Sequence, residues 1–140
     1  MIAVILAVLI TQSGWQVVSP TQPDEYARYA KSEGNGLTSE LSLSRRKCAC
    51  DPKVAAKETA DALLSMPGVS VKCQNVTVCN ESGQHLIALG IASFADQARR
   101  NIDVFLFRRK GYLYTFVYSF QSPQPNLDVE KKLKEFCPAS

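Results

Sequence analysis

The segment NIDVFLFRRKGYLYTFVYSF, residues 101–120, constrains the fold more than any other part of the chain. Its two halves alternate with the period of two that strands have, and Gly111 between them can take the positive φ of a tight turn. A hairpin that is apolar on both faces is typical of a sheet that is covered on both sides. One face carries Phe105, Phe107, Tyr112, Tyr114, Phe116, Tyr118 and Phe120, and the other carries Ile102, Val104 and Leu106.

Two helices and several further strands accompany the hairpin. Asp51 and Pro52 provide an N-cap and a first helical residue for 51–68, and Asn126 caps a second amphipathic helix over 127–137. Short runs at 37–43, 69–73, 76–80 and 85–94 have strand patterns, with a tight turn expected at Gln74–Asn75. The sequence therefore predicts an α+β fold, with a mainly antiparallel sheet of about five or six strands and two main helices packed on it. One interpretation places both helices on one face, with sheet curvature or a second sheet hiding the other face.

The first ten residues, MIAVILAVLI, are uninterrupted hydrocarbon. As a helix they would span about 15 Å, roughly half of a bilayer core, which favours a signal peptide over a membrane span. We expect residues 1–13 to be a signal peptide cleaved after Ser13; an uncleaved anchor reaching Val18 is the alternative. Residues 14–36 are predicted to be a linker in which 24–33 can form a short helix, and residues 37–140 to be a single domain. The mature chain is then exported, periplasmic or extracellular, without a stable membrane span.

Charge and motifs exclude several classes of function. A formal net charge of +3 is too small to indicate a nucleic-acid partner. His85 is the single histidine and is expected to be a solvated residue of a loop or strand end, while Asp96 and Asp103 are carboxylates with no recognisable spacing. The chain has no nucleophile motif, zinc-protease motif or phosphate-binding loop. We expect no enzyme activity, no cofactor and no metal; the sequence leaves the oligomeric state open.

All five cysteines follow the presumed cleavage site, where an oxidising compartment allows disulfides to persist. Two bridges use four of them and leave one thiol, with the pairing open. They are Cys48, Cys50, Cys73, Cys79 and Cys137. Structural bridges are favoured over a zinc site and over a redox pair at Cys48 and Cys50, because compartment and spacing suit neither alternative well. In an extended chain Cys48 and Cys50 would be about 6.5–7 Å apart at Cα, which is awkward for a mutual bridge.

Cys137 lies on the apolar face of the last helix, so a bridge to Cys48 or Cys50 would tie the C-terminus to the first helix. Such a bridge would close a long loop and stabilise the fold by about 4–5 kcal/mol. Cys73 and Cys79 can join each other only if a turn at Gln74–Asn75 brings them across. A straight strand would place them about 20 Å apart.

The aromatic hairpin and its basic ends are the candidate binding residues. If one face stays uncovered, Phe105, Phe107, Tyr112, Tyr114 and Tyr118 form an aromatic surface for a protein partner. Basic clusters at 45–47, 99–100 and 108–110, including Arg108 and Arg109, would recognise an acidic partner if they gathered at one rim; solvated strand ends are the alternative.

From Leu37 to Phe136 the order of elements, with FRRKGYLYTFVYSF near its end, resembles PsbP/DcrB-type domains. The chain departs from that pattern in its cysteines and in having no lipoprotein cysteine. The resemblance implies a non-catalytic accessory or binding protein in an exported compartment, with no site residues to carry over. We therefore expect an exported binding protein, such as an accessory factor or an inhibitor or immunity protein. A thiol-redox or metal-handling protein that uses Cys48 and Cys50 is the alternative.

Overall fold

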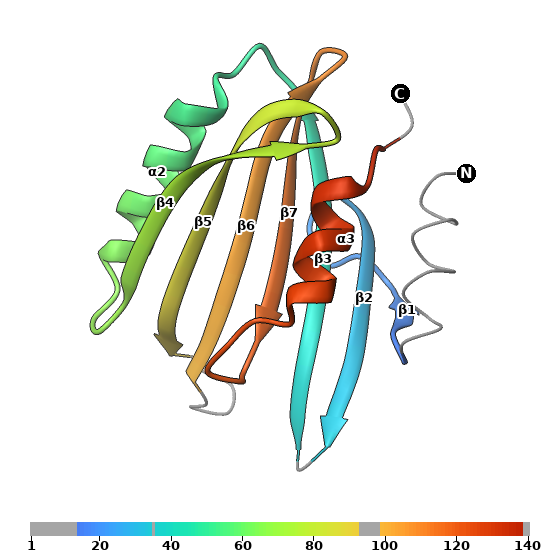
Figure 1. The fold of residues 1–140 in the computed structure, drawn as a ribbon, viewed down its shortest axis with the longest axis vertical. Coiled ribbons are helices and arrows are strands. Elements are labelled where there is room, and N and C mark those ends of the chain that lie inside the picture. Colours follow the sequence, from blue (N-terminus) through green and yellow to red (C-terminus); the bar gives the residue numbers. More distant parts are fainter. Residues whose placement is uncertain (1–13, 35, 93–98, 139–140) are drawn as a thin grey trace.

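The computed structural model describes residues 14–34, 36–92 and 99–138. These residues form one antiparallel sheet of seven strands in the order β1-β2-β3-β7-β6-β5-β4 (Figure 1). The sheet is larger than the five or six strands predicted, because residues before position 37 add two strands at one edge. The strands are β1 Gln16–Val18, β2 Glu25–Gly34, β3 Leu37–Lys47, β4 Ser70–Val78, β5 Glu81–Ala92, β6 Arg99–Arg109 and β7 Tyr112–Phe120. The predicted signal peptide, residues 1–13, lies outside the described residues.

The two predicted helices are present as α2, Pro52–Leu64, and α3, Leu127–Glu135. Their starts follow from their caps. The Asp51 carboxylate accepts a hydrogen bond from the backbone N–H of Lys53 at 2.9 Å, and the Asn126 side chain accepts one from that of Asp128 at 2.9 Å. These bonds satisfy N–H groups that have no partner within the helix, so each helix begins where the sequence predicts.

One helix covers each face of the sheet, which differs from the interpretation that places both on the same face. We call the face under α3 the inner face and the face under α2 the outer face (Figure 1). The alternation along β6 and β7 sends aromatic side chains inward and aliphatic side chains outward. The inner core includes Phe105, Phe107, Tyr114, Phe116, Tyr118, Phe120, Val129 and Leu133. The outer core includes Ala55, Ala56, Leu86, Val104, Leu106 and Leu113.

Residues 24–33, for which the sequence predicts a short helix in a linker, instead form most of β2. Tyr29 of β2 lies opposite Leu41 of β3 and is buried in the inner core. Gly34 and Gly36 have positive φ values of 85° and 77°, which reverse the chain into β3. Pairing with β3 and burial of Tyr29 thus outweigh the local helical pattern. With β1 and β2 in the sheet, residues 16–34 belong to the domain and not to a linker.

Two-residue turns close the hairpins at Cys79–Asn80 and Lys110–Gly111. All four residues have positive φ, between 51° and 84°, as the type I′ turn requires. The turn at Lys110–Gly111 confirms the predicted aromatic hairpin. The turn expected at Gln74–Asn75 is wrong, because β4 runs unbroken through it and reverses only after Val78.

Candidate functional site

Six basic residues from two distant parts of the sequence meet at one end of the sheet. We call this group the basic rim: Arg45, Arg46, Lys47, Arg108, Arg109 and Lys110. Strand β7 brings them together, because it pairs with β3 on one side and with β6 on the other. Arg46 and Arg108 both lie opposite Leu113, so their side chains project from the same, outer face. The third basic cluster, Arg99 and Arg100, begins β6 and lies at the opposite end of that strand.

The basic rim combines residues that support the fold with residues that face solvent. The Arg45 guanidinium lies 4.8 Å from the ring centre of Tyr112, which is a cation–π contact. Arg109 forms an ion pair with Glu81 at 3.8 Å and is only partly exposed. Arg46 and Arg108 are both exposed. These two side chains can therefore reach a ligand without breaking the cation–π contact of Arg45 or the ion pair of Arg109.

A hollow of about 210 Å³ lies beside α2, next to the basic rim. Its walls are Asp24, Ser44, Arg45, Arg46, Ala55, Glu58, Thr59, Leu106, Leu113 and Thr115. The apolar members come from the outer core, while the arginines and carboxylates lie around them. Such a mixture suits a peptide segment with polar ends better than a small apolar ligand.

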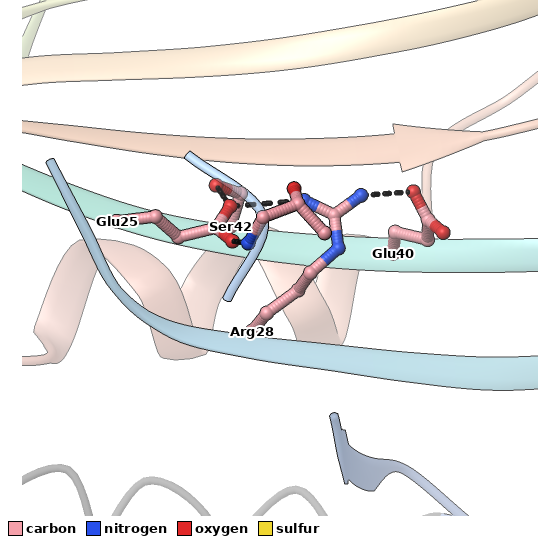
Figure 2. Close-up of polar contacts among 5 residues, drawn as sticks. Glu25, Arg28, Glu40 and Ser42 are labelled. Carbon is pink, nitrogen blue, oxygen red and sulfur yellow. Dashed lines mark hydrogen bonds and ion pairs between the residues drawn. The ribbon is translucent and has the colours of Figure 1, made fainter. Parts of the chain in front are cut away.

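A partly buried ionic network fixes β2 next to this hollow. The Arg28 guanidinium lies between two carboxylates, donating to Glu25 at 2.9 Å and to Glu40 at 2.7 Å (Figure 2). The Ser42 hydroxyl and the backbone N–H of Thr21 also donate to Glu25. Burial by itself would raise the pKa of Glu25, but these hydrogen bonds and the Arg28 charge lower it overall. Glu25 is therefore held as a carboxylate, and it links the chain before β2 to β3.

The aromatic residues predicted to form a binding surface lie inside the molecule. Phe105, Phe107, Tyr114 and Tyr118 are at most 2% exposed, because α3 and the curved edge strands cover the inner face. Tyr112 is partly exposed, and it packs against the same core. The aromatic face is therefore core and offers no surface to a partner in the folded monomer. Of the predicted binding residues, Arg108 and Arg109 remain at the surface.

The structure pairs Cys79 with Cys137 and Cys48 with Cys50, and leaves Cys73 as an exposed free thiol. A link from Cys137 to Cys48 or Cys50, one of the pairings that the sequence leaves open, is absent, since Cys137 packs on the inner core and the other two pack on the outer core. Cys48 and Cys50 lie after the end of β3, where the chain is no longer extended and their Cα atoms are 5.2 Å apart. That separation is within the range of a disulfide, unlike the extended spacing assumed from sequence.

His85, expected to be solvated, is 6% exposed and belongs to a buried polar cluster on the inner face. Its Nε2 lies 2.9 Å from Oδ1 of Asp103 and 3.7 Å from Oε2 of Glu130. Burial, followed by the hydrogen bond and charge of Asp103, raises the pKa of Glu130 to about 8. Sequence spacing missed this cluster because its members come from β5, β6 and α3. The sequence contains one indication of this cluster. Asp103 alternates onto the same face of its strand as Phe105 and Phe107, so its carboxylate must be buried among aromatic side chains.

Among the solved structures that share this fold are two that match most of this chain. One is PA94 of Pseudomonas aeruginosa, a protein of unknown function, with a TM-score of 0.58 and 10% identity over 91% of this chain and 83% of that one. The other is LpqN of Mycobacterium tuberculosis, described as involved in cell envelope biogenesis, with a TM-score of 0.60 and 13% identity over 86% of this chain and 75% of that one. No family model and no curated protein matches the sequence. At these identities the likeness concerns the fold alone.

Within the described ranges, which omit 1–13, 35, 93–98 and 139–140, we find no helix with the length and apolar character needed to cross a membrane.

Proposed function

We propose that the chain is an exported, non-catalytic accessory protein of the cell envelope, which binds an acidic segment of a partner protein at the basic rim and the adjoining hollow. The convergence of the two basic strand ends at one end of the sheet, with Arg46 and Arg108 both on its outer face, carries this proposal. Clustered positive charge accelerates the encounter with an acidic surface and selects against basic ones.

Export is supported by the apolar N-terminal segment and by the cysteines. Cys79 and Cys137 are 58 residues apart in sequence and meet with a Cα separation of 4.9 Å. Such a bridge persists in an oxidising compartment and is rare in a reducing cytosol. The envelope role described for LpqN, a fold neighbour, agrees with this placement. The PsbP/DcrB-type resemblance is part of the same proposal, since neither of the two solved structures described above carries that name.

A second candidate function rests on the pair Cys48 and Cys50. The pair directly precedes the N-terminus of α2 and directly follows the basic residues of β3. A helix N-terminus and positive neighbours favour a thiolate over a thiol, as in redox-active cysteines. A reversible Cys48–Cys50 couple, formed and broken while Cys79–Cys137 stays intact, would favour thiol exchange over binding as the main role.

The binding proposal is tested by capturing partners from the exported fraction of the native cell and then repeating the measurement with each purified candidate. Arg46→Glu and Arg108→Glu should each weaken the reconstituted complex at least tenfold, and added salt should weaken the wild-type complex. Lys131→Glu makes the same change of charge on exposed α3 and should leave affinity unchanged. A partner that binds all three variants equally well would contradict the proposal.

A further inference from the structure

His85, Asp103 and Glu130 present one imidazole nitrogen and two carboxylate oxygens to a common point below α3. The ligand atoms of the three side chains all lie within 4.8 Å of one another. A first-row divalent cation at about 2.0–2.2 Å from each ligand separates neighbouring ligands by about 3–3.5 Å. The two nitrogen–oxygen distances of 2.9 and 3.7 Å bracket that separation, so small side-chain rotations are enough to close the site.

An unpartnered buried oxygen points independently to a missing ligand. Asp103 is fully buried, and its Oδ2 has no hydrogen-bond donor among the described residues. The Glu130 side chain, 12% exposed, brings a second carboxylate to the same place. A buried carboxylate oxygen without a partner is costly, and two adjacent carboxylates repel each other unless a proton or a cation lies between them. A bound cation satisfies both requirements at once.

The imidazole is already held in the orientation that a metal ligand needs. Its ring stacks on Phe105 with a centroid distance of 4.3 Å and an interplanar angle of 10°. The Gln74 side-chain Nε2 lies 3.3 Å from Nδ1, on the far side of the ring from the carboxylates. In this orientation the amide donates to Nδ1, so the ring proton is on Nε2 and faces Asp103. Metal binding requires the amide to flip: its oxygen then accepts the Nδ1 proton and leaves the Nε2 lone pair for a metal, as outer-shell partners of metal-binding histidines do.

The site has a route from solvent. Gln74 is exposed on β4, which is the edge strand of the sheet, and the His85 and Glu130 side chains are 8% and 12% exposed. An ion can therefore enter between β4 and α3 without unfolding of the core. Water would fill the remaining coordination positions from the same side.

We propose that His85, Asp103 and Glu130 bind one divalent first-row cation, of which Zn²⁺ is the probe of choice. One imidazole and two carboxylates suit Zn²⁺ or Mn²⁺, while the lack of a thiolate at this point excludes a site built for Cu⁺. The ion would join α3 to β5 and β6. It would act independently of the basic rim, which lies at the end of the sheet and whose exposed Arg46 and Arg108 project from the outer face.

The test uses the chain from Gly14 onward with both disulfides intact, a histidine-free affinity tag, and Cys73→Ser to remove the exposed thiol as a competing zinc ligand. Calorimetric titration with Zn²⁺ at neutral pH should show one ion per chain. Because His85 is the only histidine, long-range ¹H–¹⁵N spectra should show a shift of its Nε2 resonance alone. Mn²⁺ should broaden the same resonances and compete with Zn²⁺.

The ligand variants His85→Asn and Glu130→Gln should each lower zinc affinity about tenfold or more, because loss of even an outer-shell partner of a metal site has an effect of that size. Asp128→Asn, on the exposed side of α3, is the matched control and should bind as wild type does. If Asp103→Asn fails to fold, Glu130→Gln and the wild-type His85 spectrum still decide the matter. Absence of binding at millimolar Zn²⁺, or binding that survives both ligand variants, would overturn the proposal.

Discussion

Cys79 and Cys137 join the turn between β4 and β5 to the chain just beyond the C-cap of α3. Their Cα atoms lie 4.9 Å apart, and the backbone N–H of Cys79 also donates to the carbonyl oxygen of Lys134 at 2.8 Å. The short helix α3 is thereby fixed to the sheet at its C-terminal end. Since α3 covers the aromatic inner face, this link protects most of the core.

Removal of this bridge should destabilise the fold strongly. Cys79→Ala with Cys137→Ala opens a loop of 58 residues, for which chain entropy predicts a loss of about 4 kcal/mol in the free energy of unfolding. Urea unfolding followed by near-UV circular dichroism measures the loss. Cys73→Ser, at the exposed free thiol, is the control and should change stability little. Equal stability of the two variants would show that the bridge does not form.

Native alkylation should modify one cysteine. Cys73 is exposed and unpaired, whereas the remaining four cysteines are paired, so the folded protein should take up one label at Cys73. After denaturation and reduction all five should react. Mass spectrometry of the labelled peptides gives the count. Labelling of Cys48 and Cys50 in the native, unreduced protein would contradict the pairing.

The aromatic inner face should behave as core. Phe116 is fully buried and packs edge-to-face against Phe107 and at a tilt against Phe136, so Phe116→Ala should cost about 3–5 kcal/mol of unfolding free energy. Leu127→Ala, at a side chain 75% exposed, should stay within about 0.5 kcal/mol of wild type. Chemical denaturation compares the two. A small effect at Phe116 would return the aromatic face to the list of candidate surfaces.

The buried Glu25 should make stability fall in acid. Its pKa in the folded state lies below the ordinary value of 4.5, so the folded protein holds fewer protons on this group than the unfolded chain does. The stabilisation is therefore fully present above about pH 4.5 and is lost as pH falls through the lowered pKa. Glu25→Gln should be less stable than wild type at neutral pH, and this difference should shrink below pH 4.5. A difference that is constant with pH would contradict the assignment of charge to Glu25.

The sequence predicts those parts of the fold that depend on local signals. The starts of α2 and α3 follow from Asp51 and Asn126, and the hairpin at Lys110–Gly111 follows from the glycine and the alternation beside it. Strand β2 was missed because residues 24–33 have a sequence pattern that is compatible with a short helix. Only pairing with β3 makes Tyr29 a core residue.

The cysteine pairing, the basic rim and the His85 cluster all depend on three-dimensional contacts that cannot be predicted from sequence spacing. Cysteine pairing follows from which face each cysteine packs on, and that is set by sheet order. The basic rim exists only because β7 lies between β3 and β6, a topology with several alternatives at the level of sequence. The cluster of His85, Asp103 and Glu130 needs both the strand register and the placement of α3.

The central claim is that the chain works outside the reducing cytosol with its sulfur atoms bridged. Cell fractionation of the native source, followed by peptide mass spectrometry without reduction, tests it most directly. We predict that the protein is recovered from an exported fraction with the Cys79 and Cys137 peptides covalently linked. Recovery from the cytosol with these two cysteines as free thiols would contradict the account.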